Sequence, residues 1–296
     1  MTRRDIRIGI TIGDPGGVGP EVALKAIART DLPLPVSFVL FGHGPVVEAA
    51  ERSTGLRLDR TAVPLVEPAT APVPSSARGP SADNGAASFA YFSDAVRAAR
   101  EGRLDALVTG PVSKAAWALA GLPWRGHTES LEHLYPGAIM AFWSDRLKLA
   151  LLSHHVPLRE AVGLVTRDRL RGFLVRLAEA VAAARPGPAE FLVAGLNPHA
   201  GEDGGLGREE IDEIGPAIAD ARAEGVRVRG PLPPDTAFRA ALDRPDTFAV
   251  GLYHDQGLIA FKLVAFETGV NITLGLPFVR TSPDHGTAFD IAGKSP

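Results

Sequence analysis

The sequence predicts an α/β protein, because apolar strands alternate with amphipathic helices along its 296 residues. The first strand is expected at 6–12, and helical spacing follows at 21–27. This alternation recurs along the chain and is typical of parallel sheets with right-handed crossovers. Aromatic residues make up only 6% of the chain, so Ala, Leu and Val carry the expected core. Single cores stop growing at roughly 300 residues, which favours two lobes over one.

The first half of the chain continues this pattern. A strand at 36–41 precedes a helix at 45–52, and the segment 61–88 is rich in Pro, Ala and Ser. We expect that segment to be a surface excursion, since helical periodicity resumes at 86–100. A buried strand at 104–108 then runs into the polar stretch Thr109-Gly-Pro-Val-Ser-Lys114.

The second half contains three apolar strands, each followed by a polar loop; they are expected at 147–152, 190–196 and 248–253. Between the first two, a helix with apolar residues on one face is expected from Thr166 to the stop at Pro186. Isoleucines at 3.6-residue spacing mark a further helix around 211–218.

Composition excludes several classes of protein and of site. The net charge of −3, from 31 basic and 34 acidic residues, argues against a nucleic-acid partner. There is no cysteine, so disulfides and thiolate sites are excluded and a metal would need His, Asp or Glu ligands. No apolar run approaches the roughly 20 residues of a membrane span, and the apolar alternation at 6–10 is too brief for a secretory signal. We therefore expect a cytoplasmic protein with no membrane partner.

A glycine-rich turn, Gly13-Asp-Pro-Gly-Gly-Val-Gly-Pro20, links the first strand to the first helix. Its Gly17-Val-Gly19 core lacks the third glycine of a dinucleotide fingerprint and the G-K-[ST] of a phosphate loop. The pattern favours a tight turn that brings backbone near a ligand site over a dedicated phosphate cradle.

Histidines follow all three apolar strands of the second half. His154 and His155 follow the first strand, His199 follows the second, and His254 follows the third. Carboxyl ends of parallel strands meet at one sheet edge, so these imidazoles could bind one metal ion. The competing interpretation is that each imidazole only bonds loop backbone, and spacing does not choose between His154 and His155.

A second set of polar residues could bind an anion. Lys262, Asn271 and Arg280 lie late in the chain, and His127 with Thr128 could add two further donors. Arg and Lys together suit a phosphate or a carboxylate, although each alone is more often an ion-pair partner. His285 fits a structural loop residue or a cofactor contact equally well.

Six colinear motifs resemble the 4-hydroxythreonine-4-phosphate dehydrogenase family of pyridoxal phosphate biosynthesis. They are Ile12-Gly-Asp-Pro15 with Gly19-Pro-Glu21, Thr109-Gly-Pro-Val-Ser-Lys114, Gly126-His-Thr-Glu129, Gly195-Leu-Asn-Pro-His-Ala-Gly-Glu202, Tyr253-His-Asp-Gln-Gly257 and the stretch 269–286. The resemblance implies a two-lobed isocitrate/isopropylmalate-dehydrogenase-like fold with an interdomain cleft, and a homodimer whose active site is shared between subunits. We expect lobes at 1–115 plus 257–296, which contains both termini, and at 116–256, which contains the dimer contacts.

The resemblance also implies the site residues and the reaction. It implies one divalent ion (Zn, Mg or Co) on His155, His199 and His254, and a substrate held by His127, Thr128, Lys262, Asn271 and Arg280. The cofactor would be NAD or NADP, with no binding residues identified. The reaction would oxidise 4-phosphooxy-L-threonine to 2-amino-3-oxo-4-phosphooxybutanoate, which decarboxylates to 3-amino-2-oxopropyl phosphate.

Several points stay open at this level. Asp255 is the candidate general base, but orienting an imidazole fits it as well. Related substrates such as 4-phosphothreonate, and a metal-dependent hydrolase or lyase without NAD, are the alternative functions. The family usually continues beyond Lys294 into a further helix, so the short carboxyl end is either natural or truncated.

Overall fold

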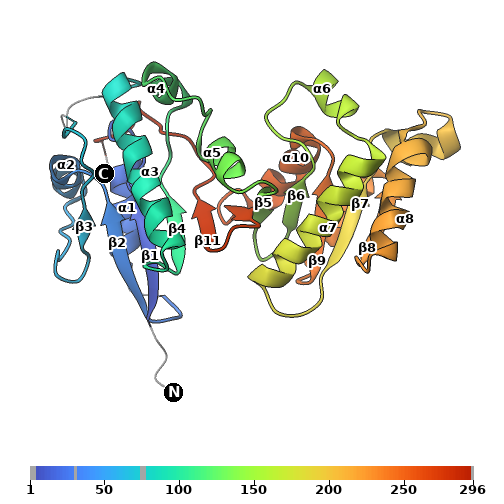
Figure 1. Cartoon of the computed structure of the whole chain (residues 1–296), viewed down its shortest axis with the longest axis horizontal. Coiled ribbons are helices and arrows are strands. Elements are labelled where there is room, and N and C mark those ends of the chain that lie inside the picture. Colours follow the sequence, from blue (N-terminus) through green and yellow to red (C-terminus); the bar gives the residue numbers. More distant parts are fainter. Residues whose placement is uncertain (1–4, 30–31, 74–77, 295–296) are drawn as a thin grey trace. The chain divides into compact units, whose positions relative to one another are not determined.

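The computed structural model describes residues 5–29, 32–73 and 78–294 and confirms the α/β class (Figure 1). The chain forms two compact units. Unit 1 comprises Met1–Pro136 and Pro277–Pro296, and unit 2 comprises Gly137–Leu276. In the described part of the chain no helix is both long and apolar enough to cross a membrane.

The unit boundaries differ from the expected lobes, 1–115 plus 257–296 and 116–256. The segment after residue 115 stays in unit 1 because the indole of Trp117 is buried there, with its ring against Phe92. The segment after residue 256 stays in unit 2 because Phe261 is fully buried against Phe142.

Unit 1 contains parallel strands in the order β3-β2-β1-β4-β11. These strands are β1 (Ile6–Thr11), β2 (Val36–Phe41), β3 (Leu65–Val66), β4 (Ala106–Thr109) and β11 (Val279–Ser282). Its helices are α1 (Gly19–Ile27), α2 (Gly44–Thr54), α3 (Ala82–Arg100), α4 (Lys114–Leu119) and α5 (His127–Leu134). Within the expected excursion 61–88, β3 forms a short edge strand, and residues 74–77 lie outside the described residues.

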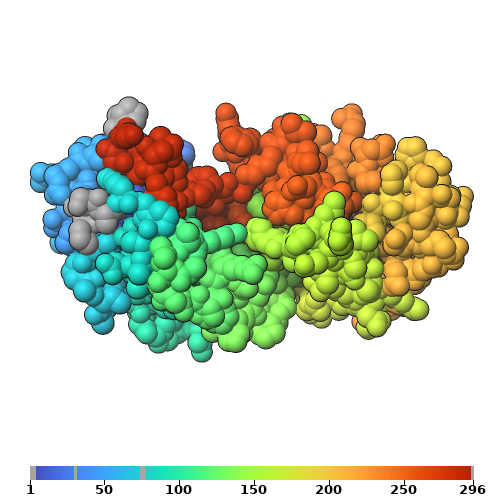
Figure 2. Space-filling view, turned by 90° about the horizontal axis from the view of Figure 1, so that it is seen from above, coloured from blue at the N-terminus to red at the C-terminus, as the bar shows by residue number. Residues whose placement is uncertain are grey.

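Helix α3 begins earlier than the expected residue 86, because Ser81 caps it by accepting a hydrogen bond from the Asn84 amide at 3.1 Å. Its buried face, which includes Tyr91 and Phe92, lies over the sheet of unit 1 (Figure 1). The carboxyl-terminal segment returns to the start of the chain (Figure 2), where the Val18 amide donates to the Thr287 carbonyl at 2.9 Å.

Unit 2 contains strands in the order β10-β5-β6-β9-β7-β8. Its strands are β5 (Ile139–Trp143), β6 (Lys148–Leu151), β7 (Glu190–Ala194), β8 (Val228–Leu232), β9 (Thr247–Gly251) and β10 (Val270–Leu274). Its helices are α6 (Leu158–Gly163), α7 (Arg167–Ala184), α8 (Gly215–Ala223), α9 (Pro234–Ala241) and α10 (His254–Ala265), with the irregular turn η1 (Pro198–Gly204) and the short π-helix η2 (Glu210–Ile214). Strands β6, β9, β7 and β8 run parallel, whereas β10, β5 and β6 pair antiparallel.

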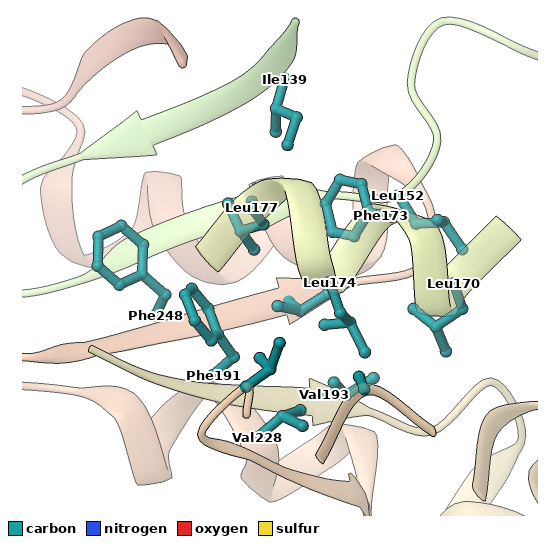
Figure 3. Packing of buried hydrophobic residues seen from close by; sticks show 14 of the residues in the cluster. Ile139, Leu152, Leu170, Phe173, Leu174, Leu177, Phe191, Val193, Val228 and Phe248 are labelled. Carbon is teal, nitrogen blue, oxygen red and sulfur yellow. The ribbon is translucent and has the colours of Figure 1, made fainter. Parts of the chain in front are cut away.

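Aliphatic and aromatic side chains hold α7 against the sheet of unit 2. Figure 3 shows Leu174 and Leu177 of this helix near Phe191 and Val193 of β7, and all four are buried. Burying each such side chain stabilises the fold by about 1.5–3 kcal/mol. This packing fixes the strands whose carboxyl ends carry the histidines.

Candidate active site

The three histidine-bearing strands are neighbours in the sheet of unit 2. Strand β9 lies between β6 and β7, and the three strands run parallel, so their carboxyl ends meet at one edge. The rings of His155, after β6, and His254, after β9, have centroids 5.5 Å apart. The His154 ring lies edge-on to His155 at 5.3 Å. His155 has a φ of 50°, a conformation that side-chain-bearing residues adopt rarely and mainly at constrained sites.

His199 lies on a different loop, the one that follows β7. It belongs to η1, where all five residues from His199 to Asp203 have positive φ. Its side chain is exposed, and its Nδ1 lies 2.5 Å from Glu202 Oε1. Among the residues that the structure describes, no group of three or more His, Cys, Asp or Glu side chains is placed to hold a metal ion within the single chain. The structure thus brings His155 and His254 together, without His199.

Carboxylates hold two of these imidazoles. The Asp255 Oδ1 lies 2.6 Å from His254 Nδ1, and Glu202 contacts His199 Nδ1 in the same way, which leaves Nε2 of each ring for a ligand. The hydrogen bond and the charge of Glu202 raise the pKa of His199 above its ordinary value. Metal-bound imidazoles usually have their second ring nitrogen held in this way, so the donor chemistry fits a metal ion although one chain brings only the His155 and His254 rings together.

Unit 1 contains a separate buried polar cluster. Arg280 of β11 is only 2% exposed, and its Nη2 donates to Thr109 Oγ1, at the end of β4, over 2.6 Å. Nearby, His127 is buried between the rings of Phe92 and Trp117, with centroids 4.7 and 5.4 Å away. The His127 Nε2 atom is buried and has no hydrogen-bond partner. An atom of this kind is costly to bury, so the cluster suits a polar ligand.

Burial sets the charges of this cluster. It lowers the pKa of Arg280 to about 9, which leaves the guanidinium positive at neutral pH. Burial, with a smaller contribution from the nearby Arg280 charge, lowers the pKa of His127 well below its ordinary value. The cluster therefore offers one buried cation and one neutral imidazole, which together can bind an anion.

The remaining expected substrate residues lie in both units. Thr128, half-buried, follows His127 in the first turn of α5 in unit 1. In unit 2, Lys262 lies on α10 with its Nζ 5.4 Å from the centre of the Phe266 ring. Asn271 lies on β10, and its Oδ1 is buried without a hydrogen-bond partner. His127 and Asn271 thus each present a buried polar atom that a substrate could satisfy.

These features agree with a known family. Residues 36–296 match the family described as pyridoxal phosphate biosynthetic protein PdxA. The chain belongs to the PdxA family. The similarity to 4-hydroxythreonine-4-phosphate dehydrogenases that the sequence motifs indicated is therefore confirmed.

Curated and solved relatives cover nearly the whole chain. The 4-hydroxythreonine-4-phosphate dehydrogenase of Aquifex aeolicus is 39% identical over 98% of this chain and 92% of the relative. A protein of Symbiobacterium thermophilum, provisionally named D-threonate 4-phosphate dehydrogenase, is 41% identical over 97% of this chain and 90% of the relative. The crystal structure of the Klebsiella pneumoniae 4-hydroxythreonine-4-phosphate dehydrogenase superposes with a TM-score of 0.84 at 35% identity, covering 98% and 94% of the two chains. Membership of the PdxA family makes this chain an oxidoreductase.

Two residues that contact the expected site residues were not predicted from the sequence. Thr109, which accepts from Arg280, stood only inside a motif, although its place at the end of a buried strand was a usable signal. Glu202, which contacts His199, also lies inside a motif, but the sequence predicted no role for it. Such contacts depend on side-chain directions that periodicity does not encode.

Proposed function

We propose that this PdxA-family protein is an NAD-dependent 4-hydroxythreonine-4-phosphate dehydrogenase of pyridoxal 5'-phosphate biosynthesis. It would oxidise 4-phosphooxy-L-threonine to 2-amino-3-oxo-4-phosphooxybutanoate, which loses carbon dioxide to form 3-amino-2-oxopropyl phosphate. The buried His127 Nε2 beside the buried Arg280 carries this proposal, because the pair suits a phosphorylated substrate. The relative from Aquifex aeolicus carries the corresponding name. The cytoplasm is the location we propose.

In this proposal the residues of unit 1 bind the anionic groups of the substrate. Arg280 neutralises a phosphate or carboxylate while Thr109 holds its guanidinium, and the neutral His127 and the Thr128 hydroxyl add hydrogen bonds. In unit 2, Lys262 supplies a second cation and Asn271 an amide.

His155, His199 and His254 would hold a divalent cation (Zn, Mg or Co), with His199 completing the set across a homodimer. When bound, this cation would polarise the alcohol oxygen, and NAD or NADP would accept the hydride. Asp255 would orient His254 through its 2.6 Å contact with Nδ1, a role that this contact favours over that of general base.

The surface of α10 supports a homodimer. Ile259 and Leu263 of this helix, which begins at His254, are 62% and 82% exposed, and Phe266, the residue that follows its end, is 76% exposed. Apolar residues at this spacing form one helix face, which a second copy of the chain would cover. A dimer formed there would bring a second chain close to the candidate metal ligands.

A second candidate substrate is 4-phosphothreonate, which the 41% identity to the Symbiobacterium thermophilum relative favours. The two substrates share the phosphate and a secondary alcohol, so the residues of unit 1 suit both. They differ at carbon 2, which carries an amino group in one and a hydroxyl in the other. A metal-dependent hydrolase or lyase would use the same histidines without a nicotinamide cofactor.

Steady-state kinetics with each substrate tests these candidates. Purified protein with Zn²⁺, Mg²⁺ or Co²⁺ and NAD or NADP is expected to produce reduced cofactor, seen at 340 nm, with a higher kcat/KM for 4-phosphooxy-L-threonine than for 4-phosphothreonate. The reverse order of kcat/KM would identify 4-phosphothreonate as the preferred substrate. Consumption of either substrate without reduced cofactor would support the hydrolase or lyase, and a chelator is expected to abolish turnover in every case.

A further inference from the structure

Glu210 holds the loop that carries His199. It is the first residue of η2, and it is buried with 5% of its surface exposed. Its Oε1 accepts hydrogen bonds from the Leu196 and Asn197 amides at 2.7 and 2.8 Å, and its Oε2 accepts from Asn197 Nδ2 at 2.9 Å. One buried carboxylate thus binds three donors in the two residues that lead into η1.

The backbone beyond these donors adopts a disfavoured conformation. From His199 to Asp203 every φ is positive, between 43° and 82°, although only Gly201 lacks a side chain. Left-handed residues occur singly as a rule, and a run of five persists only where its surroundings hold it in place. A Cβ at Gly201 would lie 2.7 Å from Glu210 Oε2, so the loop packs directly on this carboxylate.

The local helix geometry also singles out Glu210. Residues Glu210–Ile214 form a π-helix, which is rare and often lies at functional sites. The neighbouring Glu209 also accepts from Asn197 Nδ2, at 2.7 Å, but it takes no bond from the Leu196 amide or the Asn197 amide. Of these two glutamates, Glu210 is the one whose carboxylate accepts the Leu196 and Asn197 backbone amides.

We propose that Glu210 is a positioning residue that sets the place of the His199 imidazole, and this inference rests on the metal role of His199 proposed above. The carboxylate fixes the start of the loop through Leu196 and Asn197, and the left-handed run then carries His199 away from the end of β7. Replacing one acceptor oxygen of Glu210 by an NH₂ group would oppose an N–H donor with another donor. The loop would then no longer hold the His199 imidazole in the position that metal binding requires.

The test compares Glu210→Gln with Glu213→Gln in the full chain. Glu213 lies on the same short helix, and its carboxylate accepts the Arg167 amide at 2.6 Å, so its substitution makes the same change in a glutamate that bonds backbone but leaves η1 alone. Three properties are measured for each: affinity for Co²⁺ alone, the visible absorption of the Co²⁺ complex, and amide hydrogen exchange of residues 195–204.

For Glu210→Gln we expect the Co²⁺ affinity to fall about tenfold or more, with a changed absorption spectrum and faster exchange in 195–204. For Glu213→Gln all three should stay at wild-type values, even if the melting temperature falls. Wild-type affinity, spectrum and exchange in Glu210→Gln would overturn the inference. If Glu210→Gln does not fold, Asn197→Ala, which removes the Nδ2 donor, should show the same changes to a smaller degree, and wild-type values there would overturn it equally.

Failure of the proposed function would look different. If the wild-type protein binds no Co²⁺, the proposed metal site is wrong, and unchanged exchange in Glu210→Gln would then overturn the positioning of the loop as well. If the wild type binds Co²⁺ and His199→Ala weakens that binding, the metal role stands. The Glu210 comparison then decides the positioning role alone.

Discussion

Arg280 Nη2 donates to Thr109 Oγ1 over 2.6 Å, joining residues that lie 171 positions apart in the chain. Strands β4 and β11 are parallel neighbours, so the end of β4 meets β11 at the place where Arg280 is buried. A guanidinium that leaves water needs acceptors with fixed directions, and Thr109 supplies one of them. The candidate anion site therefore depends on a residue that does not itself need to touch the substrate.

Replacing Thr109 by Val should weaken substrate binding, because it keeps the shape of the side chain but removes the acceptor for Arg280. Loss of a buried hydrogen bond to a charged group costs about 1–3 kcal/mol, so we expect KM for the phosphorylated substrate to rise about tenfold with a smaller change in kcat. Thr109→Ser keeps the hydroxyl and should behave like the wild type. Equal KM values for the Val and Ser variants would contradict this role.

The buried His127 should make the fold less stable in mild acid. Its native pKa lies well below the ordinary value of 6.5, so near pH 6 the unfolded chain binds a proton at this residue and the native state does not. The free energy of unfolding should therefore fall as the pH drops below about 6.5. In His127→Phe, which retains aromatic packing against Phe92 and Trp117, thermal melts from pH 8 to 5.5 should show a shallower loss. Parallel pH profiles for the two proteins would refute this expectation.

The buried Asp14 should have the opposite pH dependence. Its Oδ2 is buried without a hydrogen-bond partner, and burial raises its pKa from 3.8 to about 6. The native state binds the extra proton, so this carboxylate destabilises the fold as the pH rises through that window. Asp14→Asn should raise the free energy of unfolding at pH 8 by on the order of 3 kcal/mol and have little effect at pH 4. Urea unfolding at both pH values measures this, with the exposed Asp168→Asn as the matched control.

Introducing a charge on α10 should dissociate the proposed dimer. Leu263 is 82% exposed, so Leu263→Glu costs the single chain little, but it would place a carboxylate in an apolar interface. We expect the mutant to elute as a monomer in size-exclusion chromatography with light scattering, and to lose activity. Leu119→Glu, at a 61% exposed position on α4 of unit 1, is the control that should stay dimeric. A dimeric Leu263→Glu protein would exclude α10 from the interface.

A shared site should also permit complementation between two inactive variants. If His254 and His199 of one metal site come from different subunits, a mixture of His254→Ala and His199→Ala proteins contains hybrid dimers with one intact site. Such hybrids should recover up to about a quarter of wild-type activity, since about half of randomly mixed dimers are hybrids and each has one good site of two. No recovery, with subunit exchange verified by differently tagged chains, would argue that each site lies within one chain.

Strands β1, β2, β4, β6, β7 and β9 were predicted from the sequence, whereas β3, β5 and β8 and the side-chain partners were not. The expected strand at 36–41 matches β2, and the three histidine-bearing strands overlap the expected ranges, each one or two residues shorter than expected. Hydrophobic periodicity marks buried strands well, because each strand must bury its own side chains. The unit boundaries did not follow from sequence order, since Trp117 and Phe261 lie in the units where their rings are buried.

The sequence by itself determined the α/β class, the family and the residue types available for chemistry, because these depend on periodicity and on motifs that are read along the chain. Only the tertiary structure showed that β6, β9 and β7 are adjacent, that His155 meets His254, and that His199 stays with Glu202 in a left-handed loop. It also showed that Thr109 holds Arg280 and that Glu210 holds the His199 loop. The physical reason is that a hydrogen bond needs a distance near 3 Å and a direction, and folding brings these about between residues that the sequence keeps apart.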